Sequence, residues 1–97
     1  MFVINLTYQV SLETVDRFLE EHICYLEEQY NAGNFMVSGR KEPRTGGIIL
    51  AKGESIDQIE QIIEKDPFKK HGVATYEIIE FTPSKTREEL GLSLIHI

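Results

Sequence analysis

A long run of helical periodicity, which starts at Leu12 and ends near Ala32, constrains the fold of this chain more than any other feature. Acidic and basic residues fill most of its polar positions, so the predicted helix is amphipathic and must lie against an apolar layer. Ser11 precedes it as a good N-cap, and Gly33 follows it as the expected left-handed residue. The apolar positions recur three and four residues apart, as on one helix face: Leu12, Val15, Leu19, Ile23, Leu26 and Tyr30.

Four short strands and a second helix make up the rest of the expected fold. Strands are predicted over residues 2–8, 34–39, 46–52 and 73–81. Ser55 and Gln58 form a capping box that begins the second helix, and Pro67 requires this helix to end near Lys65 or Asp66. The order is βαββαβ. Short connections and right-handed crossovers then favour an α+β, ferredoxin-like sandwich, with an antiparallel sheet and both helices on one face.

Several predicted strands are apolar on both of their faces. This holds for residues 35–37, 48–50 and 78–79. A sheet face that met water would alternate apolar with polar residues along each strand. Because two helices cover only one face, we expect the other face to pack against a second subunit, which gives a homodimer with stacked sheets.

Charge and cysteine content narrow the classes of function. The net charge of −6 argues against nucleic acid or an anionic membrane as the main partner, since both favour basic protein surfaces. No segment has the pattern of a signal peptide or a transmembrane helix. Cys24 is the only cysteine, so we expect neither an intrachain disulfide nor a cysteine metal cluster, and a reducing, cytoplasmic compartment is favoured.

His22 is the unusual member of the first helix, because its angular position falls inside the apolar arc. An imidazole there faces either the body of the protein or the lip of a pocket. From the spacing alone, a structural histidine satisfied by a neighbour is the leading interpretation. The functional interpretation needs a second group within reach of the ring.

Two other places carry polar groups of interest. Asp66 is expected at the end of the second helix, where a carboxylate faces the negative end of the helix dipole unless a donor compensates. The simpler interpretation is that Asp66 caps a short turn begun by Pro67. Ser38 and Arg40 end the second strand on the face opposite Val37, where an ordinary strand end is the simpler interpretation.

A group of motifs resembles the YCII-related domain family over residues 2–81, nearly the whole chain. They are Arg17-x4-His22-x3-Leu26, Gly33, Ser38-Gly39, Gly46-Gly47, Asp66-Pro67-Phe68 and Gly72. The resemblance implies membership of the dimeric α/β-barrel superfamily and a His–Asp pair, here His22 and Asp66, in a pocket on each subunit. Arg40 stands near that pocket, where many relatives have proline.

The resemblance also assigns the domain boundaries. Residues 1–83 are expected to form the YCII-related domain, and residues 84–97 a tail. Residues 92–97 form an apolar run that resembles a translated sequencing adapter. We expect this run to be a truncation artefact, so His96 is left out of any site; the alternative is a genuine C-terminal strand.

Relatives of a chlorinated-hydroquinone dehydrochlorinase in this family imply acid–base chemistry on small ring compounds. The first hypothesis is a lyase or isomerase with His22 as general base and acid and Asp66 as its orienting partner. In this first hypothesis, Ser38 and Arg40 hold an oxyanion. Phe68 and Tyr76 form apolar walls of the pocket. The second is a non-catalytic binding or accessory domain for a small ligand. Neither hypothesis requires a metal or organic cofactor, because one His and one Asp are too few ligands for a usual zinc site.

Overall fold

The predicted βαββαβ order is present in the computed structural model, which describes residues 1–85 and 87. The expectations for residues 92–97 and for His96 lie outside the described residues. A third, very short helix follows the second, and it was not predicted. The elements are β1 (Phe2–Tyr8), α1 (Leu12–Asn31), β2 (Phe35–Arg40), β3 (Gly46–Ala51), α2 (Ile56–Ile63), α3 (Pro67–Lys70) and β4 (Ala74–Glu80).

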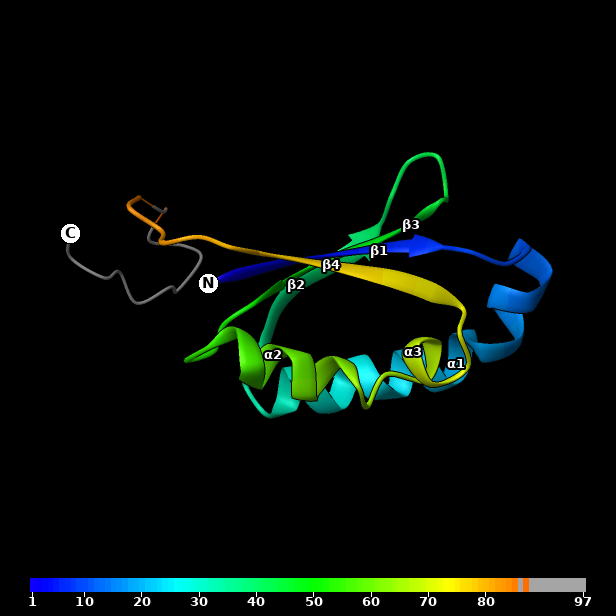
Figure 1. The fold of residues 1–97 in the computed structure, drawn as a ribbon, viewed down its shortest axis with the longest axis horizontal. Helices are drawn as coiled ribbons and strands as arrows, with labels where there is room; N and C mark the ends of the chain where they lie inside the picture. Colours follow the sequence, from blue (N-terminus) through cyan, green and yellow to red (C-terminus); the bar gives the residue numbers. More distant parts are fainter. Residues whose placement is uncertain (86, 88–97) are drawn as a thin grey trace.

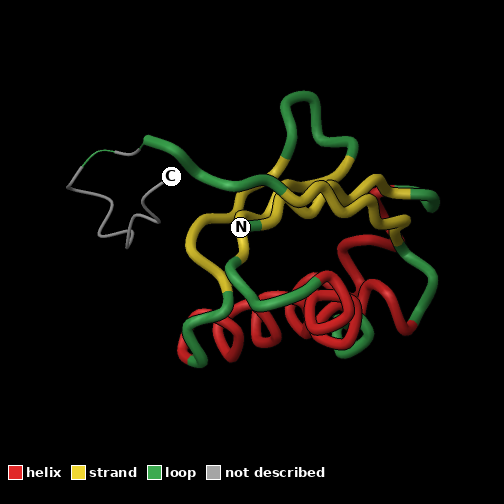
Figure 2. Tube along the Cα trace, turned by 60° about the vertical axis from the view of Figure 1, so that its left-hand side comes forward, coloured by secondary structure: helices red, strands yellow, loops and turns green. Residues whose placement is uncertain are grey.

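The four strands form one antiparallel sheet in the order β2-β3-β1-β4. All three helices lie on one side of this sheet, as Figures 1 and 2 show from two directions. The fold is therefore the α+β, ferredoxin-like arrangement that the element order predicts. None of the described helices is long and apolar enough to cross a membrane.

Strand β2 contains a β-bulge, which interrupts the alternation of its side chains, while Ser38 and Arg40 lie opposite Val37 as predicted. Phe35 pairs with Ala51, but Val37 pairs with Leu50, so Met36 is an extra residue on this strand. Without the bulge, Phe35 and Val37 would lie on one face of the sheet. With it, Ser38 pairs with buried Ile49, which places Ser38 on the helix-covered face. Val37 instead faces away from the helices and is 56 % exposed.

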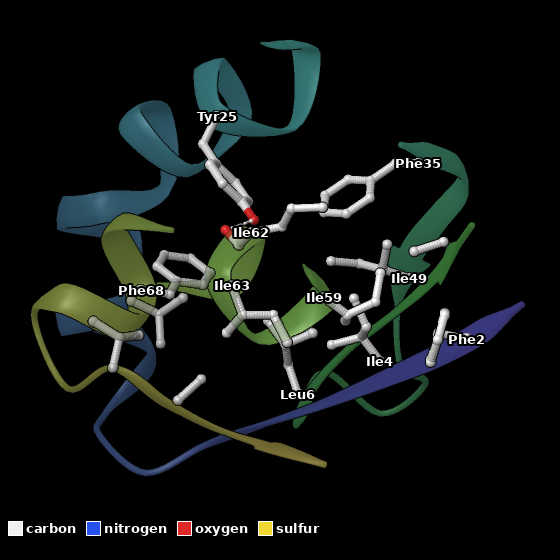
Figure 3. Close-up of a cluster of buried hydrophobic side chains, with 14 residues drawn as sticks. Phe2, Ile4, Leu6, Tyr25, Phe35, Ile49, Ile59, Ile62, Ile63 and Phe68 are labelled. Atoms are coloured by element: carbon white, nitrogen blue, oxygen red, sulfur yellow. Dashed lines mark hydrogen bonds between the residues drawn. The ribbon is translucent and has the colours of Figure 1, made fainter. Parts of the chain in front are cut away.

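The hydrophobic core fills the space between the sheet and the helices, and Figure 3 shows its central side chains. Residues of β1 and α2 are prominent in it, together with Phe35, Phe68 and Ile49. The described contacts include one polar link in this layer, in which the Tyr25 hydroxyl donates to the backbone oxygen of Ile62 at 2.8 Å.

The buried face of α1 is rotated from the predicted stripe. Leu12, Ile23 and Tyr30 are exposed, whereas Tyr25 and Gln29 are buried. The rotation follows from α3, which packs beside α1 and covers the side that carries His22. His22 is consequently near the middle of the buried face, with 8 % of its surface exposed.

The opposite face of the sheet has no helix over it in the described chain. The strand register brings Val3 beside Leu50 and Ile79, and Val37 beside Leu50. Ile48 and Ile79 are 40 % and 49 % exposed. This set of side chains, Val3, Val37, Ile48, Leu50 and Ile79, is called the open sheet face below.

Candidate active site

Asp66 lies between α2 and α3, and not at the end of α2 as predicted. The second helix ends three residues earlier, at Ile63, with Glu64 as its C-cap. Asp66 is the N-cap of α3: its Oδ1 accepts a hydrogen bond from the Phe68 backbone N–H at 2.9 Å. The capping interpretation of Asp66 is thus confirmed, and the Phe68 backbone N–H supplies the carboxylate with a donor.

The same carboxylate oxygen contacts His22. Nδ1 of His22 lies 2.8 Å from Oδ1 of Asp66, across 44 residues of sequence. Asp66 is fully buried and His22 nearly so. Because an ionised carboxylate only accepts, Nδ1 is the protonated nitrogen in this contact, and Nε2 is the nitrogen left for a ligand. We call this pair the dyad.

Phe68 supports the dyad from one side. Its ring stacks on the His22 imidazole with centroids 3.9 Å apart and planes 3° from parallel. The ring is 1 % exposed, so the imidazole rests on a rigid apolar surface. Tyr25 flanks His22 at a centroid distance of 6.2 Å.

Tyr76 has a different position from the one expected for an apolar wall of the pocket. Its hydroxyl donates to Oδ2 of Asp66 at 2.6 Å, and the residue does not line the cavity described below. Burial and the negative charge of Asp66 raise the pKa of Tyr76 far above its usual range. Burial, and then Asp66, also raise the pKa of Tyr25.

A small cavity opens beside the dyad between α1 and the ends of β1, β2 and β3. Its volume is about 160 Å³. His22, Ser38, Arg40 and Phe68 all line it, as do Leu6, Tyr8, Leu19, Ile23, Leu26, Gly46 and Gly47. The lining is largely apolar with a few polar groups, which is typical of small-molecule sites.

The fold and this site can be compared with known proteins. The sequence pattern of the YCII-related domain matches residues 1–82. The chain belongs to this family. No curated protein sequence matches it.

One solved structure similar to this YCII-related protein is 5-chloro-2-hydroxyhydroquinone dehydrochlorinase from Burkholderia phenoliruptrix AC1100, in complex with 2,5-dihydroxybenzoquinone. The two chains are 22 % identical, and the match covers 91 % of this chain and 96 % of the other. The TM-score is 0.73, so the likeness shows the shared fold.

Ser38 and Arg40 reach the cavity of the YCII-related protein in different ways. The Ser38 hydroxyl lies 2.6 Å from the Tyr30 hydroxyl, which anchors it to α1. Arg40 is largely exposed, and its Nε lies 3.4 Å from a carboxylate oxygen of Glu42. Ser38 is therefore fixed by the fold, whereas the Arg40 side chain lies at the solvent side.

Two features of this site were not predicted. Tyr8 lines the cavity. Its inward-facing position at the end of an alternating strand is the sequence feature that could have indicated this. Arg44 bonds Asp16 of α1 at 2.6 Å and so ties the β2–β3 connection to the helix; no sequence signal indicated this contact. In the part of the chain that the structure describes, no three His, Cys, Asp or Glu side chains are grouped so that they could hold a metal ion.

Proposed function

We propose that this YCII-related protein is a small-molecule lyase or isomerase that moves protons with the His22–Asp66 dyad. One observation carries the proposal: a buried carboxylate holds Nδ1 of a histidine whose ring lines a small cavity. This contact fixes the tautomer in which Nε2 is a base. Asp66 also stabilises the imidazolium that forms when Nε2 takes a proton.

The chemistry needs only the chain's own residues. Nε2 of His22 takes a proton from a carbon or a hydroxyl of the bound molecule, and the electron pair stays on the substrate. In an isomerisation, His22 returns the proton to a different atom. In an elimination, the electron pair forms a new double bond and an anionic group leaves with its own pair. Ser38 and Arg40 are proposed to hold the oxygen on which negative charge develops.

The proposed substrates are single-ring compounds with hydroxyl or carbonyl oxygens. A cavity of about 150 Å³ in another protein holds one benzene molecule, and the cavity here is about 160 Å³. The similar dehydrochlorinase structure contains 2,5-dihydroxybenzoquinone, a molecule of this class. His22 and Phe68, whose rings are stacked, both belong to the lining of this cavity.

Binding and turnover should be tested separately. A panel of small phenols, quinones and lactones, including 2,5-dihydroxybenzoquinone, is screened by thermal shift and then by absorbance for turnover. His22→Gln should abolish turnover and keep most of the ligand affinity. His71→Gln is the matched control, because His71 does not line the cavity. Ligands that bind with no turnover in the wild-type chain would favour the alternative, a non-catalytic binding domain.

We also propose a homodimer through the open sheet face. Its apolar side chains are contiguous across three strand pairings, and Val37, Ile48 and Ile79 are each at least 40 % exposed. Contiguous exposed apolar surface of this kind marks an interaction site. A second copy supplies the matching apolar face, and the two stacked sheets would form the dimeric α/β barrel implied by the family.

A further inference from the structure

Asp66 is bound by more donors than a dyad needs. Its Oδ1 accepts from His22 Nδ1 at 2.8 Å and from the Phe68 backbone N–H at 2.9 Å. Its Oδ2 accepts from the Tyr76 hydroxyl at 2.6 Å, the shortest of the three contacts. The three donors come from α1, α3 and β4, so the carboxylate is fixed by three separate elements.

We propose that Tyr76 is a positioning residue for the dyad: its hydroxyl holds Oδ2 of Asp66 and thereby sets the direction and strength of the hydrogen bond that Oδ1 accepts from His22. The inference deepens the proposed function and rests on it for its catalytic meaning. Tyr76 itself does not line the cavity, so it acts on a substrate only through Asp66.

The physical reason is competition for one negative charge. Each donor to a carboxylate draws charge toward itself, so a strong donor on Oδ2 weakens the bond that Oδ1 makes. Tyr76 also prevents the carboxylate from turning about its bond to the chain. A general base must give its proton back, and an imidazolium that is held too tightly by its carboxylate returns it poorly.

The other groups around Asp66 do not perform this role. Tyr25 of α1 is close enough to feel the carboxylate charge, but its hydroxyl donates to the Ile62 backbone oxygen. Lys69 of α3 lies over the Tyr76 ring, with Nζ 5.8 Å from the ring centroid, and Tyr8 of β1 is near enough to contribute a small charge effect on Tyr76. The raised pKa of Tyr76 keeps its hydroxyl protonated, so it stays a donor at all ordinary pH values.

The test measures the NMR chemical shift of the imidazole Nδ1–H proton of His22, in the full chain without any ligand. Tyr76→Phe keeps the ring and removes the donor, so the bond to His22 strengthens and the proton resonance should move downfield. Tyr76 replaced by a fluorotyrosine is a stronger donor and should move it upfield. Tyr25→Phe is the matched control, since it removes a neighbouring buried hydroxyl that does not touch Asp66, and it should leave the resonance in place.

Each outcome decides the inference. A downfield shift of the Nδ1–H resonance in Tyr76→Phe, with the resonance of Tyr25→Phe in place, supports it. An unchanged resonance in Tyr76→Phe, or equal shifts in both variants, overturns it. A wild-type chain with no protected Nδ1–H would refute the dyad and the proposed function together.

Kinetics separate this inference from the proposed function. Once a substrate is found, Tyr76→Phe should lower kcat and leave KM nearly unchanged, because the residue lies outside the cavity lining. A protein without turnover would refute the lyase or isomerase assignment. It would leave the NMR result, and hence the role of Tyr76 at Asp66, unaffected.

Discussion

The His22 imidazole and the Phe68 phenyl ring lie face to face, 3.9 Å apart and within 3° of parallel. The backbone N–H of Phe68 also donates to the carboxylate oxygen that contacts His22. Phe68 therefore orients both members of the dyad, one through its ring and the other through its main chain.

Phe68→Ala should destabilise the chain by about 3–5 kcal/mol, because it removes a large and almost fully buried ring. It should also reduce any His22-dependent turnover, since the imidazole loses the surface on which it rests. Denaturant unfolding measures the first effect. Leu12→Ala, at an exposed apolar position, is the control and should cost much less.

Asp66→Asn should keep the fold and lose the chemistry. Asparagine is as good an N-cap as aspartate, so α3 still has its cap. An amide has one acceptor oxygen and carries donors in place of the other, so it cannot accept from His22, Phe68 N–H and Tyr76 together. We expect turnover to fall by about 10²–10⁴-fold, the usual range for a lost acid–base group.

The control for that variant is Asp57→Asn, at an exposed acidic position in the first turn of α2. Its turnover should match the wild type. Equal activity of Asp66→Asn and the wild-type chain in a steady-state assay would mean that the carboxylate has no part in the reaction.

Stability should fall as the pH rises above about 10. The pKa values of Tyr25 and Tyr76 are both raised in the folded chain, so between the unfolded value near 10 and the folded values the native state binds more protons than the unfolded state. The free energy of unfolding then decreases with pH. It is measured by denaturant unfolding at stepped alkaline pH.

The double variant Tyr25→Phe/Tyr76→Phe should show a flatter decline over the same pH range. It should also be less stable than the wild type at neutral pH, because the buried Ile62 oxygen and Asp66 Oδ2 lose their donors. Parallel alkaline profiles for the two proteins would contradict the assignment of the effect to these phenols.

Val37→Lys should convert the proposed dimer into a monomer, because it places a charge in the open sheet face. Sedimentation at micromolar concentration gives the mass directly. Ile56→Lys alters an exposed apolar residue of α2, 41 % exposed and away from the sheet, and should remain dimeric. A wild-type monomer at that concentration would end the dimer proposal.

Periodicity and capping residues were sufficient to predict most of the fold. Ser11, Ser55 and Gly33 occupy the helix ends that their chemistry indicated. The four-residue helix α3 was missed because it is too short to show the helical periodicity of apolar residues. The bulge at Met36 was missed because an extra residue in a strand leaves no mark on the alternation before the partner strand is known.

The site was less predictable than the fold. His22 could be placed on an inward helix face from spacing, but its contact with Asp66 joins residues 44 positions apart, and only the family resemblance suggested it. The Tyr76 hydroxyl was not identified as a donor, since the partner of a phenol depends on tertiary packing. Asp66 was predicted at the end of α2 because Pro67 sets the last position at which that helix could end. The helix ends earlier, at Ile63, so Asp66 begins α3 instead.

The bulge at Met36 determines which side chains of β2 face the cavity, because it sets the register of the residues that follow. If Met36 paired with Leu50 in place of Val37, the pairing would be regular and the following residues would turn over. Ser38 and Arg40 would then point to the open sheet face, and Val37 and Gly39 would line the cavity in their place. A one-residue change of strand register would thus replace the polar groups that β2 gives the cavity with apolar ones, although no residue is substituted.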